Sequence, residues 1–197
     1  MTIHQLLKIS YVNGPGARFV VWVQGCFRNC PGCFNPGTHD RDGGCKMEIS
    51  DIVSEIPPES VTGITVSGGE PFDQPDDLAL LLEEAGKKGL NRLVYSGYTY
   101  EELLGHKNSM VAKSLSLIDI LIDGPYERQI PPYMPWTGSG NQRVLELQNG
   151  VIKKTCKKSD YETKNCTEGE LIINRDGSIT ATGMIDSKTI YDKLENG

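Results

Sequence analysis

Apolar runs alternate with turn-forming residues along most of the chain. Residues 17–24 read Ala-Arg-Phe-Val-Val-Trp-Val-Gln, a β-branched and aromatic run that is typical of a buried strand, and residues 61–66 form a second such run. Between them, residues 47–56 carry apolar positions at helical spacing and are followed by Pro57 and Pro58. The pattern predicts two strands that are connected by a helix.

The same alternation continues beyond these elements. A leucine-rich helix over residues 76–88 leads to a strand over residues 91–95, and after two helical stretches a further strand spans residues 118–122. Repeated strand–helix units predict an α/β fold with a parallel sheet and right-handed crossovers. The length suits one domain with an appendage, and we divide the chain into residues 1–148 and residues 149–197.

The segment after residue 148 changes character. It begins with a lysine-rich stretch that is poor in apolar residues, and it continues into two β-rich runs on either side of Asp176-Gly177, a strong signal for a β-hairpin. An isolated hairpin is marginally stable in water, so we expect this one to pack on the sheet or on a partner. Two roles stay open: selecting a protein substrate, or covering an open edge of the sheet.

The balance of charge excludes some classes of function. The chain has 197 residues, with 20 Lys and Arg against 26 Asp and Glu, and its formal net charge is −6. It has no excess of positive charge to neutralise phosphates, so general binding to nucleic acid or to anionic membranes is not expected. No apolar run approaches about 18 residues, and the first residues lack the pattern of a signal peptide. We therefore expect a cytoplasmic protein.

Half of the six cysteines crowd into a short segment directly after the first predicted strand, at Cys26, Cys30 and Cys33. In a reducing compartment such a group indicates metal or redox chemistry rather than disulfides. Three thiolates can hold three corners of an iron–sulfur cube and leave one metal position open for catalysis. The cysteines alone leave an alternative open, a structural zinc site that Cys45 completes.

A second motif, Ser67-Gly68-Gly69-Glu70, follows the next predicted strand. The carboxyl ends of neighbouring parallel strands meet at one edge of a sheet, so we expect this motif to lie beside the cysteine loop. Glycines let a ligand approach the backbone, and the Glu70 carboxylate is suited to accept a hydrogen bond from a cationic amine. The two motifs together predict a ligand site at this edge.

The Cys-x3-Cys-x2-Cys loop and the Gly-Gly-Glu motif, in this order, resemble those of the radical S-adenosylmethionine superfamily, and in particular those of the glycyl-radical-enzyme activases of the anaerobic ribonucleotide reductase type. The similarity covers residues 1–148, and it implies an α/β fold with a short partial (β/α) barrel, to which the predicted β-hairpin is a C-terminal extension. Further stretches that carry the resemblance are Gly14-Pro15-Gly16-Ala17-Arg18, Gln24-Gly25-Cys26, Cys30-Pro31-Gly32-Cys33-Phe34-Asn35-Pro36, Ser96-Gly97-Tyr98-Thr99-Tyr100-Glu101-Glu102-Leu103, Asp119-Ile120-Leu121-Ile122-Asp123-Gly124-Pro125 and Trp136-Thr137-Gly138-Ser139-Gly140-Asn141-Gln142-Arg143.

The resemblance also implies roles for individual residues. Cys26, Cys30 and Cys33 would hold a [4Fe–4S] cluster whose fourth iron is chelated by S-adenosylmethionine. The methionine amino end would be received by Gly68, Gly69 and Glu70. The adenine and cluster side would be lined by Gly32, Cys33 and Phe34, and the ribose or methionine portion would face Ser96, Gly97 and Asp123. We assign no catalytic side chain beyond these cofactor ligands, and none among the isolated His4, His39 and His106.

The implied activity is that of an oxidoreductase of anaerobic metabolism. It would cleave S-adenosylmethionine reductively to a 5′-deoxyadenosyl radical and generate a glycyl radical on a large partner enzyme, with electrons from a flavodoxin- or ferredoxin-like donor. Two alternatives are kept: a radical S-adenosylmethionine enzyme that modifies a peptide or a small molecule, and a non-catalytic zinc or electron-transfer protein. No contact with nucleic acid or with a membrane is expected.

Overall fold

A computed structural model describes residues 1–161, 168–173, 177 and 179–184. Eight strands form one mixed sheet in the order β3-β1-β2-β4-β5-β6-β7-β8. The strands are β1 (Thr2–Ser10), β2 (Arg18–Val23), β3 (Cys45–Lys46), β4 (Gly63–Gly68), β5 (Asn91–Tyr95), β6 (Ile120–Asp123), β7 (Arg143–Gln148) and β8 (Val151–Thr155). The helices are α1 (Ile49–Ser54), α2 (Pro75–Lys87), α3 (Tyr100–Leu104) and α4 (Ser109–Leu117), and 3-10 turns span Pro36–Thr38, Pro71–Asp73 and Lys158–Tyr161.

The centre of the sheet is parallel and its flanks are antiparallel. Strands β2, β4, β5 and β6 run parallel, as the repeated strand–helix units predict. Strands β1, β3, β7 and β8 pair antiparallel, so the prediction of a parallel sheet is wrong outside the centre. The reason lies in the connections, because β1–β2, β6–β7 and β7–β8 are joined without the crossover helix that parallel neighbours need. Within the described residues β3 and β8 are the two edges of an open sheet.

Three strands escape prediction from the sequence, namely the two-residue β3 and the longer β1 and β8. In β1 the buried positions do not alternate regularly, and β8 lies at an edge with most of its residues exposed, so neither carries a clear period of two. The predicted strands and the helix over residues 76–88 are present within about two residues of their expected bounds. Strand β8 pairs with β7 although it lies beyond residue 148, and the division of the chain at that residue remains a prediction.

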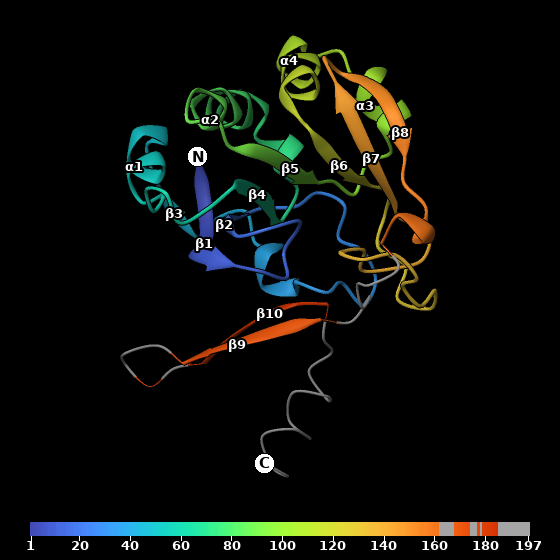
Figure 1. The fold of residues 1–197 in the computed structure, drawn as a ribbon, viewed down its shortest axis with the longest axis horizontal. Helices are drawn as coiled ribbons and strands as arrows, with labels where there is room; N and C mark the ends of the chain where they lie inside the picture. Colours follow the sequence, from blue (N-terminus) through green and yellow to red (C-terminus); the bar gives the residue numbers. More distant parts are fainter. Residues whose placement is uncertain (162–167, 174–176, 178, 185–197) are drawn as a thin grey trace.

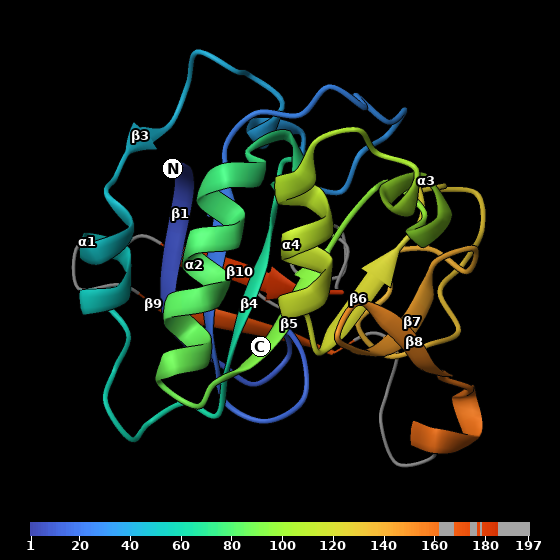
Figure 2. The ribbon, with the colours of Figure 1, turned by 90° about the horizontal axis from the view of Figure 1, so that it is seen from above.

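Helices α1, α2 and α4 cover one face of the sheet (Figures 1 and 2). Val21 and Val23 of β2 join Leu81 of α2 in the main apolar core, whereas Trp22 between them belongs to the opposite face. The two faces therefore differ, since one carries the main core, and the other carries a smaller apolar cluster over β5 to β7 and leaves space for a site beside it. None of the helices in the described part of the chain is long and apolar enough to span a bilayer.

The predicted C-terminal hairpin is confirmed. Strands β9 (Gly169–Ile173) and β10 (Ile179–Gly183) form a separate antiparallel pair, which lies on the face of the sheet opposite the helices (Figures 1 and 2). Asp176 of the predicted turn falls outside the described residues. The hairpin packs by side-chain hydrogen bonds against β1 and the residues that follow it, and it does not extend the eight-stranded sheet.

Arg18 at the start of β2 is a buried charged residue that ties neighbouring strands together. Its guanidinium donates to Thr65 Oγ1 at 2.6 Å, to the Ile64 carbonyl at 2.5 Å and to the Asn91 carbonyl at 2.9 Å. Burial lowers the pKa of Arg18 to about 10, so the side chain stays charged at neutral pH. A side chain at Gly14 would press on the Arg18 stem, which accounts for the glycine in the Gly14–Arg18 motif.

Replacing Arg18 with Met is expected to lower the free energy of unfolding by about 3 kcal/mol, because several buried carbonyl and hydroxyl oxygens lose their donor. Urea unfolding of the metal-free protein measures this change. Lys8→Met is the matched control, since Lys8 is 70% exposed and pairs with the exposed Glu55, and it should change stability by less than about 0.5 kcal/mol. Equal stability of the two variants would contradict the assignment.

Candidate functional site

The site begins where β2 and β4 end. The two strands stay paired to their last residues, with Val23 opposite Gly68, so the loops that follow start side by side. The backbones of these loops are joined by two hydrogen bonds, from Gly69 N to the Val23 carbonyl at 2.8 Å and from Glu70 N to the Gly25 carbonyl at 3.0 Å. The predicted juxtaposition of the cysteine loop and the Gly-Gly-Glu motif is therefore present.

Packing between the two loops explains the glycines. Gly68 has a φ of +103°, and a Cβ added there would lie 2.5 Å from the Val23 backbone. A Cβ added at Gly69 would collide with the Gly25 carbonyl oxygen. Both glycines therefore permit close approach of one chain segment to another. The sequence predicts a second reason for the glycines, the close approach of a ligand. The contact between the two loops requires them already without a ligand.

The three clustered cysteines face a cavity of about 670 Å³, which is within the size range of small-molecule sites. Cys26, Cys30 and Cys33 are free and half-buried, and burial raises the pKa of the Cys26 and Cys33 thiols. Cys45 is exposed on β3 and Cys156 is buried next to Glu146, and neither lines the cavity. Cys166 lies outside the described residues.

The cavity gathers nearly all of the residues that the sequence singles out. Asp123 does not line it, although its neighbour Gly124 does. The predicted residues that line it are Cys26, Cys30, Gly32, Cys33, Phe34, Gly68, Gly69, Glu70, Ser96 and Gly97. In the described part of the chain, no three His, Cys, Asp or Glu side chains are arranged to hold a single metal ion. What each lining residue binds remains a prediction.

The buried side chain of Glu70 connects the loop after β4 with the loop after β5. Its Oε1 accepts hydrogen bonds from Phe72 N and Ser96 Oγ, both at 3.0 Å, and its Oε2 accepts one from Gly97 N at 2.7 Å. Burial raises the pKa of Glu70 to about 7, and the donors at Phe72 and Gly97 only partly offset this effect. The carboxylate thus fixes the loop after β5 against the loop after β4.

Two buried nitrogen atoms on the cavity wall, Arg28 Nε and His39 Nε2, have no hydrogen-bond partner within the described residues. The Arg28 guanidinium lies over the Tyr98 ring at 4.6 Å, and the Arg128 side chain crosses Gly32. Sequence reasoning missed all three basic side chains. Only Arg28 carried a usable signal, since it stands inside the cysteine loop.

Comparison with known proteins shows which family the chain belongs to. The family model of the 4Fe-4S single cluster domain matches residues 12–145. The anaerobic ribonucleoside-triphosphate reductase-activating protein of Salmonella typhi is 34% identical over 158 residues, which cover 75% of this chain and 100% of the relative. The chain belongs to the radical S-adenosylmethionine activases.

Other activases share the similarity. The anaerobic ribonucleoside-triphosphate reductase-activating protein of Enterobacteria phage T4 is 28% identical over 160 residues, covering 78% of this chain and 99% of the relative. The pyruvate formate-lyase-activating enzyme of Clostridium pasteurianum is 33% identical over 128 residues, covering 60% of this chain and 51% of the relative. Similarity to both kinds of activase locates the chain among the enzymes that generate glycyl radicals.

A [4Fe–4S] cluster and S-adenosylmethionine are the cofactors of this activase. The residues present fit both groups. Three free thiols on one loop are a donor set that would hold the cluster, and the unpartnered nitrogen atoms of Arg28 and His39 offer donors to a polar ligand in the same cavity. Because cluster ligands must be thiolates, cluster binding by these half-buried thiols would have to remove their protons.

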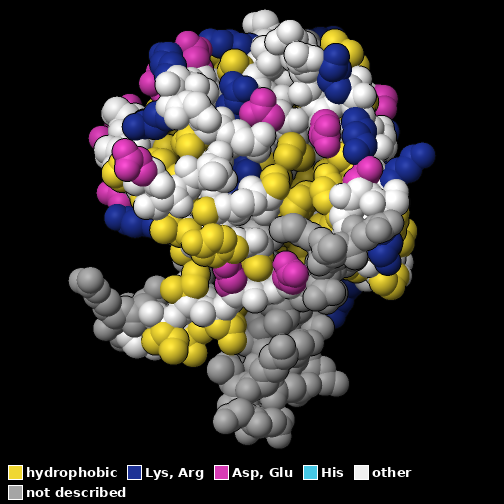
Figure 3. All heavy atoms as spheres, in the orientation of Figure 1, with side chains coloured by type: hydrophobic (Ala, Val, Ile, Leu, Met, Phe, Trp, Pro, Cys, Tyr) yellow, Lys and Arg dark blue, Asp and Glu magenta, His cyan; other side chains and the backbone are white. Residues whose placement is uncertain are grey.

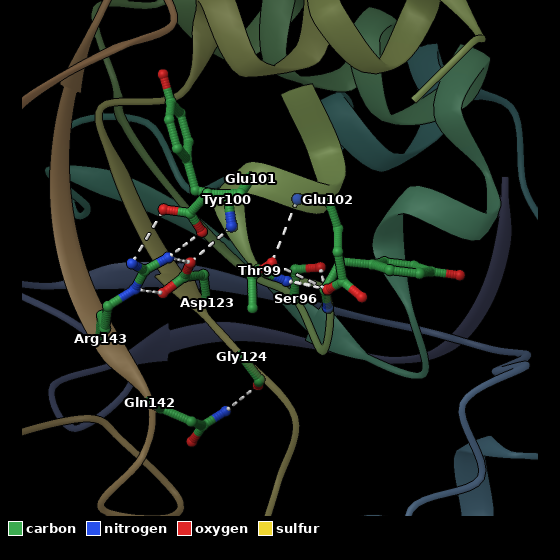
Figure 4. A network of polar contacts seen from close by, with 10 residues as sticks. Ser96, Thr99, Tyr100, Glu101, Glu102, Asp123, Gly124, Gln142 and Arg143 are labelled. Atoms are coloured by element: carbon green, nitrogen blue, oxygen red, sulfur yellow. Dashed lines mark hydrogen bonds and ion pairs between the residues drawn. The ribbon is translucent and has the colours of Figure 1, made fainter. Parts of the chain in front are cut away.

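The carboxylate of Asp123 accepts hydrogen bonds from other residues of the protein. Its Oδ2 accepts a hydrogen bond from Tyr100 N at 2.7 Å, and Arg143 donates to both of its carboxylate oxygens. Arg143 also forms an ion pair with Glu101 of α3 at 2.7 Å (Figure 4). This network holds the start of α3 against β6 and β7, directly beside the cavity-lining Gly124. The predicted contact of Asp123 with the cofactor remains a prediction.

Glu70→Gln is expected to change how stability depends on pH. The folded-state pKa of about 7 exceeds the ordinary value of 4.5, so the folded state binds more protons and loses stability as pH rises from 4.5 to 7. Between pH 5.5 and 8 this loss is on the order of 2 kcal/mol. Urea unfolding of the metal-free variant should show a flatter pH dependence than wild type. Identical pH dependence in the two proteins would refute the raised pKa.

Proposed function

We propose that this activase generates the glycyl radical of an anaerobic ribonucleoside-triphosphate reductase. The observation that carries the proposal is the 34% identity with the Salmonella typhi activating protein over that protein's whole length. The pyruvate formate-lyase-activating enzyme matches over only 51% of its own length, so this similarity gives less support to a pyruvate formate-lyase as the partner. We further propose a cytoplasmic location and a flavodoxin- or ferredoxin-like electron donor.

The proposed roles follow from positions on the cavity wall. Cys26, Cys30 and Cys33 hold the cluster, while Gly68 and Gly69 offer their backbone to the methionine amino end. Glu70 neutralises that amine and keeps the loop after β5 in place. Gly32, Cys33 and Phe34 lie on the adenine side, and Ser96 and Gly97 on the ribose or methionine side. Asp123 does not line the cavity, and its proposed place on the ribose or methionine side rests on the family resemblance and on its neighbour Gly124, which does line it. When bound, the cluster and S-adenosylmethionine supply the one-electron chemistry that the side chains cannot.

The chain's own residues position the cofactor and limit access of water. Arg28 and Arg128 are the arginines on the described cavity wall, and they offer positive charge to the S-adenosylmethionine carboxylate. We propose that the open sheet corresponds to a partial (β/α) barrel whose free side admits a polypeptide. An open side suits a glycine in a protein chain better than a small substrate that the site must enclose.

Replacing any one of Cys26, Cys30 or Cys33 with Ala is expected to reduce 5′-deoxyadenosine formation to background, because each removes one corner ligand of the cluster. Iron content and product yield after anaerobic reconstitution are the measurements. Cys45→Ala and Cys156→Ala are the matched controls and should keep activity within about two-fold of wild type, since neither thiol reaches the cavity. Full activity of Cys30→Ala would remove the support for the cluster assignment.

The proposed function is tested by mixing the reconstituted protein with the anaerobic ribonucleoside-triphosphate reductase of the same organism. Electron paramagnetic resonance should detect a glycyl radical that requires S-adenosylmethionine, a reductant and wild-type activase. A pyruvate formate-lyase serves as the competing partner. A radical on the lyase alone would reassign the partner, and S-adenosylmethionine cleavage without a radical on either protein would overturn the proposal.

A further inference from the structure

The hairpin β9–β10 is attached to the protein by its polar face. Glu170 of β9 accepts hydrogen bonds from Ser10 Oγ at 2.7 Å and from Tyr11 N at 2.8 Å. Thr182 of β10 accepts one from the buried Asn13 Nδ2 at 2.8 Å. The hairpin lies beyond residue 145, where the family match ends. It is therefore an element that the matched domain does not include.

The opposite face of the hairpin is apolar and exposed. The pairing places Ile173 across from Ile179 and Leu171 across from Ala181, so the four side chains share one face. Ile173 is 79% exposed, Ile179 50% and Leu171 39%, and apolar side chains lie on the hairpin at the lower left of Figure 3. We call these four residues the outer apolar face. Clustered exposed apolar side chains mark interaction sites more often than isolated ones do.

The polar contacts specify this orientation. If the hairpin were turned over about its long axis, the outer apolar face would lie toward β1, and Glu170 and Thr182 would be exposed. The bonds of Glu170 to Ser10 and Tyr11, and of Thr182 to Asn13, hold the hairpin against that alternative. Burial of apolar surface favours the turned-over arrangement by about 25 cal/mol per Å². Exposure of this face is thus fixed by specific contacts.

The hairpin that carries the outer apolar face also forms part of the cavity wall. Ala181 belongs to this face and also lines the cavity, and Thr182, Gly183 and Met184 beside it are further lining residues. Helices cover the other side of the sheet (Figure 1), so access from that side is closed. A ligand that extends from the cavity to Ile173 spans most of the hairpin. A polypeptide segment meets this requirement and a small molecule does not.

We propose that the outer apolar face is the docking surface for the glycine-bearing polypeptide of the partner enzyme, which crosses the hairpin to reach the cavity. This inference rests on the proposed function. Within the described residues, β9 and β10 pair only with each other. Each strand therefore also presents a free edge that an extended segment can join. The hairpin is a recognition element, and the cysteines and Glu70 do not depend on its outer side chains.

The test uses the reconstituted full-length double variant Ile173→Ser/Ile179→Ser. Its KM for the anaerobic ribonucleoside-triphosphate reductase should rise at least about ten-fold, while its iron content and its partner-free cleavage of S-adenosylmethionine stay within about two-fold of wild type. Val151→Ser on β8 is the matched control, since Val151 is apolar and 61% exposed but lies outside the outer apolar face. Its KM should match that of wild type.

Three results would overturn the inference, and they are distinguishable. An unchanged KM in the double variant shows that the partner does not use this face. Wild-type protein that sediments as a dimer, together with a monomeric double variant of unchanged KM, shows that a second copy of the chain covers the face. If wild-type protein cleaves S-adenosylmethionine yet yields no radical on the reductase, the proposed function fails and the inference fails with it.

Discussion

The close pairing of β2 with β4 is the constraint on which the site depends. Because the two strands remain in register to Val23 and Gly68, their loops emerge at one point and share hydrogen bonds. The backbone of Gly69 fits against the Gly25 carbonyl only because no side chain intervenes. A residue with a Cβ at this position has to force the loops apart. The thiols on one loop and the carboxylate on the other then cease to line the same cavity.

Successive strand ends are tied to this pair by polar contacts. Glu70 joins the loop after β4 to Ser96 and Gly97 after β5, and Arg28 crosses from the cysteine loop to the Tyr98 ring. Asp123 then fixes the end of β6 to the start of α3. The cavity wall is thereby ordered by the protein's own contacts. A radical reaction needs such order, because a loosely held cofactor exposes its reactive carbon to water and to unintended hydrogen donors.

The sequence predicts the parts of this arrangement that have a short-range signal. The apolar run before Gly25 and the three close cysteines identify a strand and its loop without any knowledge of the fold. Strand β8 lacks such a signal, because an edge strand with exposed residues has no buried face to impose a period of two. The antiparallel flanks of the sheet are not predicted either. The antiparallel pairing of β6 with β7 follows from a connection without a helix and not from the composition of either strand.

Side-chain partners distant in sequence are harder to anticipate. Asp123 resembles a ligand-binding residue at a strand end, yet Arg143, twenty residues away, engages its carboxylate. The cavity wall formed by Thr182 to Met184 follows from the hydrogen bonds of the hairpin to Ser10 and Asn13, about 160 residues away along the chain. In both cases the decisive interaction is a specific hydrogen bond, which leaves no trace in hydrophobic periodicity.

Different interactions hold the elements that cover the two faces of the sheet, and this difference matches the roles of the faces. Apolar contacts with Leu78, Leu81 and Leu82 of α2 bury the helix side, and such contacts are non-directional and spread over a large area. On the cavity side a smaller apolar cluster packs over β5 to β7, while the hairpin beside β1 is held through hydrogen bonds, each contributing only about 1 kcal/mol. An apolar seal on this side would fill the space that the cofactor and the incoming glycine require. Polar attachment leaves that space open while it fixes the hairpin's orientation.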